Sequence, residues 1–197
     1  MKSEEDVIQL VKEDQWMMGI LTVANSLNLP DWWVCAGFVR TKIWDKLHGY
    51  HERTPLADVD VIYFDRGNVN KSEEKKLEKQ LTEILPNVPW SVKNQARMHM
   101  INNLPPYISS VDAIAKFPET VTALGVKLDK DERVVLTAPY GIEDVIDMEV
   151  RPTNFFKRTN ERIDVYEQRM MKKNWKAKWD KVNVHHIESI KRERARS

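Results

Sequence analysis

Two aspartates two residues apart, Asp58 and Asp60, lie at the start of an apolar run that ends near Phe64 and reads as a β-strand. Side chains two apart on a strand point to the same face of a sheet, so we expect both carboxylates on one face. Paired carboxylates suit Mg²⁺ (or Mn²⁺), which prefers oxygen ligands. The pattern predicts a divalent-metal site at this pair, although a strand with an acidic outer face has the same pattern.

A second candidate site precedes the aspartates. The apolar run Trp32–Cys35 is followed by Ala36 and Gly37, after which apolar residues recur with helical spacing. A strand that turns through small residues into a helix leaves free backbone N–H groups where a phosphate can bind. Because glycine allows a close approach to the backbone, we predict a phosphate site at Ala36 and Gly37.

These residues carry a resemblance to known proteins. Residues 34–44, VCAGFVRTKIW, resemble the Gly-Gly-x-Val-Arg-Asp signature of the CCA-adding and poly(A) polymerase group, and Asp58-Val59-Asp60 resembles the Asp-x-Asp of that superfamily. More closely, residues 29–152 are similar to a family of small bacterial nucleotidyltransferase-like proteins, in the segments LPDWWVCAGFVRTKIWDKLHG, TPLADVDVIYFD, PWSVKNQARMH, FPETVTALGVKL and APYGIEDV.

The resemblance implies an α/β nucleotidyltransferase fold of the polymerase β type. It implies transfer of a nucleotidyl group from an NTP to a hydroxyl of an unidentified acceptor, with Mg²⁺ held by Asp58 and Asp60. It also implies that Gly37 lies against the triphosphate and that Arg40 lies near the site. From the residues alone, Arg40 is equally suited to pair on the surface with an acid such as Asp31 or Asp45.

The sequence departs from the superfamily pattern. Ala36 stands in place of the first Gly of the signature, and Thr41 in place of its Asp. The superfamily places a third carboxylate, which acts as a base, on the strand after the Asp-x-Asp hairpin, and alignment on PWSVKNQ puts Ser91 there. Three outcomes are open: the enzyme works slowly with two acids, the chain binds a nucleotide without turning it over, or another acid approaches, such as Asp65, Asp112 or Asp144.

A polar cluster follows Ser91. The amides of Asn94 and Gln95 offer the donors and acceptors that recognise a base edge or a sugar hydroxyl, so both are predicted to bind the nucleotide. His99 could replace the missing carboxylate as a general base. The alternative is that these side chains satisfy buried backbone groups at the end of a strand.

The elements that position these residues follow from apolar spacing and turn residues. We predict a short mixed sheet with helices packed mainly on one face. The strands are expected at 32–35, 56–64, 88–92, 121–128, 133–137 and 148–150. The helices are expected at 3–27 as one or two helices, at 38–48 ending at Gly49, at 70–84, at 110–116, at 142–146 and from Thr159 through Trp175.

Composition limits the class of protein. The 197 residues are 42% hydrophobic and 31% charged, with a net charge of +1, which is typical of a globular domain. No apolar run approaches the length of a membrane span, and the N-terminus does not read as a signal peptide, so no membrane partner is expected. Cys35 is the single cysteine, which excludes an internal disulfide and favours a reducing, cytoplasmic location.

Charge is unevenly distributed. Residues 169–197 contain ten Lys or Arg and three acids, a charge of +7, which leaves −6 on residues 1–168. We therefore expect a nucleotidyltransferase-like domain at 1–168 and a basic helical extension at 169–197, which either binds nucleic acid or is a solvated helix end. Trp175 and Trp179 are expected to dock this extension on the domain. Two alternatives to an enzyme follow: a degenerate nucleotide-binding or regulatory protein, and an RNA-binding module.

Overall fold

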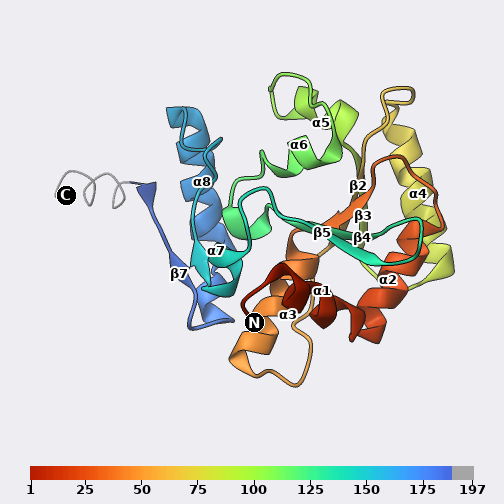
Figure 1. The fold of residues 1–197 in the computed structure, drawn as a ribbon. Coiled ribbons are helices and arrows are strands. Elements are labelled where there is room, and N and C mark those ends of the chain that lie inside the picture. Colours follow the sequence, from red (N-terminus) through yellow and green to blue (C-terminus); the bar gives the residue numbers. More distant parts are fainter. Residues whose placement is uncertain (188–197) are drawn as a thin grey trace.

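A mixed five-stranded sheet in the order β3-β2-β1-β4-β5 forms the centre of the computed structural model, which describes residues 1–187 (Figure 1). β2 and β3 are parallel, and the other neighbouring pairs are antiparallel. The strands are β1 (Trp33–Cys35), β2 (Val59–Tyr63), β3 (Trp90–Asn94), β4 (Gly125–Leu128) and β5 (Val134–Thr137). The predicted α/β fold with a short mixed sheet is confirmed.

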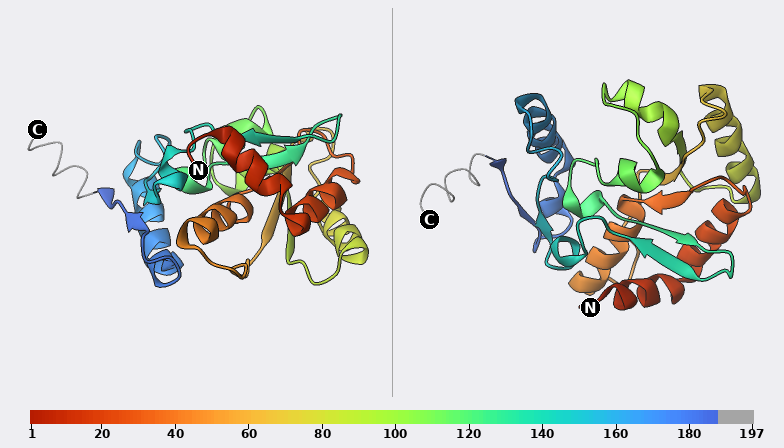
Figure 2. Two further views of the ribbon diagram at one scale, coloured as in Figure 1. Left: turned by 60° about the horizontal axis from the view of Figure 1, so that its bottom comes forward. Right: turned by 45° about the horizontal axis from the view of Figure 1, so that its top comes forward.

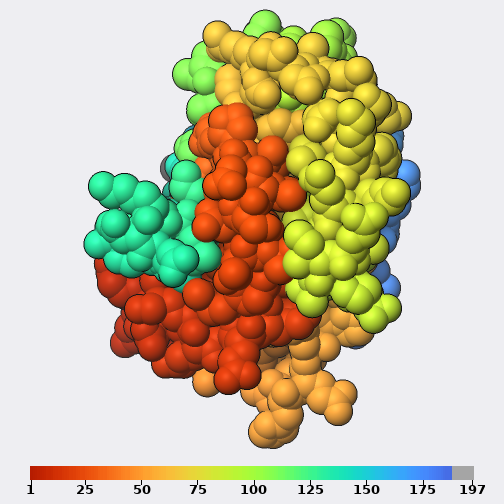
Figure 3. Space-filling model, turned by 90° about the vertical axis from the view of Figure 1, so that its right-hand side faces the viewer, coloured from red at the N-terminus to blue at the C-terminus, as the bar shows by residue number. Residues whose placement is uncertain are grey.

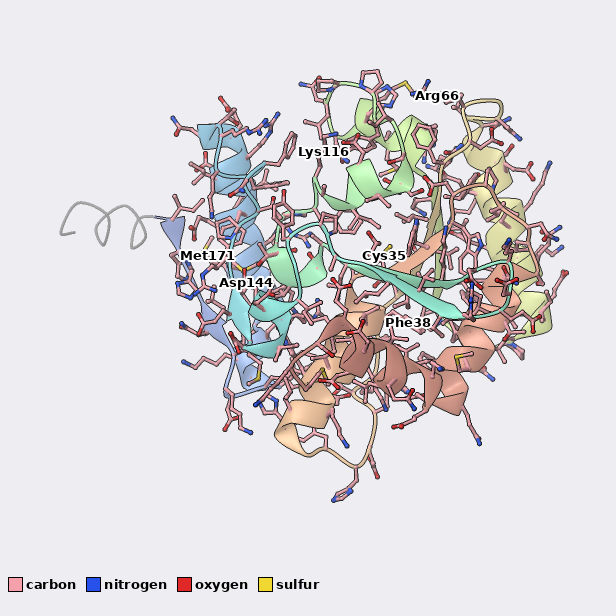
Figure 4. All side chains as sticks on the ribbon, viewed as in Figure 1. Cys35, Phe38, Arg66, Lys116, Asp144 and Met171 are labelled. Atoms are coloured by element: carbon pink, nitrogen blue, oxygen red, sulfur yellow. The ribbon has the colours of Figure 1, made fainter. Side chains whose placement is uncertain are left out.

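Helices cover one face of this sheet. Residues such as Val34, Val61 and Val126 point from the strands into a buried core shared with the first four helices. Figure 4 shows Phe38 of that core below the sheet. These helices are α1 (Glu4–Lys12), α2 (Gln15–Asn25), α3 (Gly37–His48) and α4 (Lys71–Ile84). In the space-filling view of Figure 3, α4 lies beside the end of α2.

Fewer residues pack against the opposite face of the five-stranded sheet. Trp33, Cys35 and Ile62 alternate with the residues of the main core and form a second cluster with Ile114 and Ala123. The cover comes from α6 (Ser110–Ile114) and the 3-10 helix η1 (Thr120–Thr122). Because Asp60 alternates with Val59 and Val61 in β2, it lies on this less-covered face.

Local chemistry sets several element boundaries where the sequence predicts them. The Ser3 hydroxyl accepts from the Asp6 amide in a capping box at α1, and the Asn70 side chain caps α4. Gly49, with φ +70°, ends α3 in the left-handed conformation. Three strands differ from the predicted ranges by more than one residue: β2 begins at Val59, β3 is shifted by two residues, and β4 begins at Gly125 because the residues before it form η1.

The remaining elements are α5 (Gln95–Ile101), α7 (Glu143–Ile146), β6 (Glu149–Val150), α8 (Asn160–Lys173), the 3-10 helix η2 (Trp175–Ala177) and β7 (Asn183–Val184). β6 and β7 form a separate two-stranded parallel sheet. Figures 1 and 2 show α8 and β7 on the side of the molecule opposite α4. None of the helices among residues 1–187 is long and apolar enough to cross a membrane.

The C-terminal region differs from the expected helix. α8 ends at Lys173, because Asn174 takes a left-handed conformation with φ +41°, so Trp175 lies outside the helix. The predicted boundary between residues 168 and 169 falls inside α8. Trp175 and Trp179 pack edge-on against Trp44 and are only 6% and 2% exposed, so they dock this region on the domain as expected. The rest of the predicted extension, residues 188–197, lies outside the described residues.

Candidate functional site

A cleft of about 560 Å³ opens on the less-covered side of the sheet, between the start of α3, the residues before β2 and the end of α8. Its size is within the range of sites that hold a nucleotide-sized molecule. Five of the residues predicted from the sequence line it, namely Ala36, Gly37, Arg40, Asp58 and Asp60. The structure therefore brings the aspartate pair and the small-residue turn to one cavity.

The two aspartates lie on one wall of this cleft. Asp60 is in β2, directly opposite Cys35 of β1, and Asp58 lies one residue before the strand. Burial raises the pKa of Asp60 to about 6, and the Asp58 carboxylate acts in the same direction. Neither forms an ion pair with residues 1–187, and in that range no third His, Cys, Asp or Glu completes a metal-binding group.

These properties fit a divalent cation. A cation between the carboxylates would favour their ionised forms, which burial and mutual repulsion disfavour. Mg²⁺ commonly takes one or two protein carboxylates and completes its octahedron with water and substrate phosphates. Asp58 and Asp60 are therefore suited to hold Mg²⁺ or Mn²⁺ together with a phosphate ligand.

The turn between β1 and α3 has an unusual backbone. Ala36 has φ +55° and ψ −116°, a conformation that favours glycine, and α3 begins without a side-chain cap. A Cβ added to Gly37 would lie 3.6 Å from Nη2 of Arg40 and 3.9 Å from Cδ2 of Leu56. Gly37 therefore keeps open a space in the cleft beside the uncapped amides of the helix.

Arg40 lies in the floor of the cleft and is only 8% exposed. Its guanidinium carbon is 5.1 Å from the ring centre of Trp44, 4.6 Å from that of Trp175 and 6.0 Å from that of Trp179. Burial lowers the pKa of Arg40 to about 10, although nearby Glu119 opposes this shift. Its Nε has no hydrogen-bond partner among the described residues. A buried cation without a carboxylate partner is costly, which indicates a site for an anion.

The alternative of a surface ion pair for Arg40 is wrong. Asp31 instead accepts from the Ser110 amide, and Asp45 accepts from Thr54 and from Nε1 of Trp179. Asp45 is buried, and its three hydrogen bonds join α3, the loop after it and the C-terminal region. Both acids therefore hold the fold together, and neither neutralises Arg40.

A basic wall of the cleft was not predicted from the sequence. It consists of basic side chains from α8 and the turn that follows, Arg169, Lys172, Lys173 and Lys178. Arg169 is bound to the fully buried Glu119, with Nε 2.7 Å from Oε1. The charge of +7 on residues 169–197 was a signal for this wall, but charge alone does not say where a segment packs.

Ser91 lies beside Asp60 on the neighbouring strand. β2 and β3 pair in parallel with Asp60 opposite Ser91, and the Ser91 side chain is close enough to lower the pKa of the Asp60 carboxyl, against the larger effect of burial. The three acids that the sequence offered as replacements have other partners and do not line the cleft. Asp65 accepts from the Gly67 amide, while Asp112 and Asp144, the latter labelled in Figure 4, form ion pairs with Lys116 and Arg151.

Asn94 and Gln95 do not line the cleft. The side-chain amide of Asn94 donates to the backbone carbonyls of Asp65 and Asn68, and its oxygen accepts from the backbone N–H groups of Asp65 and Ala96. This use of the side chain matches the structural alternative, the satisfaction of backbone groups at a strand end.

Two further polar residues follow the same strand. Gln95 is buried and donates to the Lys93 carbonyl. His99 packs edge-on against Tyr107, its Nδ1 has no partner among residues 1–187, and it does not line the cleft. The geometry therefore gives His99 no place beside the aspartates.

Comparisons with known proteins bear on the family and the fold. A family model described as nucleotidyltransferase matches residues 22–184. A protein whose NMR structure reveals a CCA-adding enzyme head domain is 37% identical, with a TM-score of 0.85 over 94% of this chain and 97% of that one. A search of curated proteins found no match.

Two structures of CCA-adding enzymes share the fold at lower similarity. An apo form and a complex with ATP are each 14% identical to this chain, with TM-scores of 0.55 and 0.53. The match covers 92% and 90% of this chain but only 43% and 42% of those enzymes. This likeness shows the fold alone, and this chain spans less than half of their length.

Proposed function

This chain belongs to the nucleotidyltransferase family, and we propose that it transfers a nucleotidyl group from an NTP to a hydroxyl of an acceptor. The observation that carries the proposal is the single cleft lined by the aspartate pair, the Ala36-Gly37 turn and Arg40. A CCA-adding enzyme of the same fold has been solved with ATP, which supports an NTP as the donor.

Each of these groups has a role in the proposal. The triphosphate lies against the first turn of α3, where uncapped amides and the space at Gly37 receive it. Arg40, held by its tryptophan neighbours, donates to a phosphate oxygen. Asp58 and Asp60 hold Mg²⁺ (or Mn²⁺), which when bound stabilises the charge that develops on the phosphorus oxygens.

A second candidate is a nucleotide-binding protein that regulates without turnover. Ser91 favours it, because a hydroxyl cannot take the acceptor's proton as a carboxylate would, and no other acid among residues 1–187 joins the pair. This candidate uses the same cleft and the same NTP. It differs from the first only in whether pyrophosphate is released.

The test is a thermal melt with NTP and Mg²⁺ or Mn²⁺, followed by an assay for pyrophosphate. We expect metal and NTP together to raise Tm, and Asp58→Asn with Asp60→Asn to abolish the metal-dependent part of the rise. The control is Asp147→Asn with Asp164→Asn, which makes the same charge change at exposed positions outside the cleft.

The outcomes separate the candidates. A Tm rise with pyrophosphate release from some acceptor supports transfer, and a rise without release from any acceptor supports regulation. No rise with any NTP, or an equal rise in the Asp58 and Asp60 variant, contradicts both.

Nucleic-acid binding through residues 169–197 and a cytoplasmic location are weaker proposals. The first is supported by the charge of +7 and the second by the single cysteine. RNA binding driven by this charge would weaken steeply with added salt.

A further inference from the structure

The basic wall of the cleft has no role in the proposal above. Lys172, Lys173 and Lys178 extend from the end of α8 and the following turn, and they line the same cleft as Asp58 and Asp60. Lys173 is close enough to Asp60 to lower the pKa of that carboxyl. The C-terminal region therefore contributes charge to the cavity that holds the aspartate pair.

These lysines differ from others on the surface. Lys75 and Lys76 of α4 pair with glutamates of their own helix, and Lys181 donates to the Leu47 carbonyl. Within residues 1–187 the three lysines of the wall form no ion pair. Their charges remain available to a ligand, since no described carboxylate forms an ion pair with them.

The charge of the cleft depends on this wall. Arg169 is neutralised by the buried Glu119, so without the three lysines the lining keeps one free cation, Arg40, against two aspartates. Such a cleft would carry net negative charge and repel a triphosphate. With the lysines it carries +2, which complements a complex of Mg²⁺ and a triphosphate, whose charge is roughly −2.

The wall is held in place by the tryptophans around Arg40. Trp175 lies between Lys173 and Lys178 in the chain, and its ring covers the Arg40 guanidinium at 4.6 Å. The carbonyl of Lys178 accepts from the Tyr50 hydroxyl at 2.6 Å. The backbone that carries the lysines is therefore fixed beside the cation in the cleft floor.

We infer that Lys172, Lys173 and Lys178 form a pyrophosphate-binding wall that holds the β- and γ-phosphates of the donor. This inference rests on the proposed function. In the transfer step, the acceptor oxygen bonds to the α-phosphorus as the bond from that phosphorus to the bridging oxygen breaks. The leaving pyrophosphate takes the bonding electron pair, so cations placed at these phosphates stabilise it. The proton of the acceptor hydroxyl passes to water.

The experiment compares ligands that differ in the β- and γ-phosphates. Calorimetry with Mg²⁺ would measure binding of a non-hydrolysable NTP, of inorganic pyrophosphate and of the matching NMP. The variant is Lys172→Gln with Lys173→Gln, and the control is Lys130→Gln with Lys176→Gln, two exposed lysines that do not line the cleft. A second variant, Lys178→Gln, tests the wall from the other side of the turn.

We expect the double variant to lose about tenfold or more in affinity for the NTP analogue and for pyrophosphate, because each lost contact to a charged group is worth roughly tenfold. NMP binding and Tm should change little, and the control should behave as the wild type. Lys178→Gln should reduce affinity in the same direction.

Other results overturn the inference. They are unchanged NTP affinity in both lysine variants, an equal loss for NTP and NMP, or an equal loss in the control. If the wild type binds the NTP analogue and the lysine variants bind it equally, only the wall is wrong. If the wild type binds neither the analogue nor pyrophosphate, the proposed function itself fails.

Discussion

Ala36 holds a backbone conformation, φ +55° and ψ −116°, that costs a residue with a Cβ about 1–3 kcal/mol. Glycine takes it without that strain but loses about 0.5–1 kcal/mol more entropy on folding. We therefore expect Ala36→Gly to raise the free energy of unfolding by about 1 kcal/mol, measured in urea. Gly49→Ala, at φ +70°, is the opposite control and should destabilise. A loss of stability in Ala36→Gly would show that the conformation is not strained.

Substitution of Gly37 should affect ligand affinity rather than stability, because the proposed role of Gly37 is to leave space for a phosphate. A Cβ there meets Arg40 and Leu56 at 3.6 and 3.9 Å, which is ordinary contact, so Gly37→Ala should change the free energy of unfolding by less than about 1 kcal/mol. The same methyl group fills the space proposed for a phosphate. We expect at least about a tenfold loss of NTP affinity by calorimetry. Unchanged affinity would remove the triphosphate from this turn.

Ser91 offers a direct test of the missing third carboxylate. Ser91→Asp places an acid opposite Asp60 in the paired strand, so without metal we expect repulsion to lower Tm. Mn²⁺ should raise Tm more in this variant than in the wild type, because a third oxygen ligand strengthens the site. Ser91→Asn is the neutral control. An equal effect of Mn²⁺ on wild type and variant would mean that residue 91 does not face the ion.

At the scale of elements, the sequence predicted those helices and strands whose ends are determined by nearby residues. Caps, turns and alternating apolar residues located most strands and helices, as at Ser3, Gly49 and Asn70. Register was not predictable, since the pairing of Asp60 with Cys35 and with Ser91 depends on strands far apart in the chain. Asn94 shows the same limit: its side chain looked suited to a ligand, but the fold uses it to bind backbone at the strand end.

Asp14 joins two elements, and its charge can be tested by pH. Its side chain caps α2 at the Met17 amide and pairs with Lys42 and Arg53. Burial opposes its ionisation, but these partners outweigh burial and lower its pKa below the usual 3.8. A lowered folded-state pKa contributes stability above the unfolded-state value, and that contribution is lost as pH falls through the folded-state value.

Asp14→Asn isolates this charge, because Asn caps a helix as well as Asp does. We expect the variant to be less stable by about 1 kcal/mol at pH 7, in urea melts. The difference should shrink as the pH falls below about 4, where the carboxyl of the unfolded chain takes up its proton, and should be gone once the pH is below the lowered folded-state pKa. A difference that stays constant with pH would mean that the ion pairs contribute nothing.

At the scale of the whole molecule, the charge pattern predicts a domain at 1–168 with a basic helical extension at 169–197. In the structure, α8 runs through that boundary, and the residues after it pack against α3 and the cleft. The sequence led us to expect that Trp175 and Trp179 dock this region on the domain. It could not show that they pack on Trp44, because that contact joins residues far apart in the chain. The same contacts explain why the basic wall was missed.

Removal of the C-terminal region should therefore unfold the domain. A chain ending at Lys173 loses four buried side chains, Trp175, Trp179, Val182 and Ile187, and uncovers Arg40 and Trp44. Truncation of one buried tryptophan to alanine costs about 3–5 kcal/mol, so the loss should consume most of a typical domain stability of about 5–15 kcal/mol. We expect a cooperative melt, followed by circular dichroism, to be lost or greatly lowered in Tm, and NTP binding to be lost with it. A chain ending at Ile187 is the control, because it keeps every described contact. If the chain ending at Lys173 melts at the wild-type temperature, residues 174–187 are an appendage, and Lys178 does not belong to the folded site.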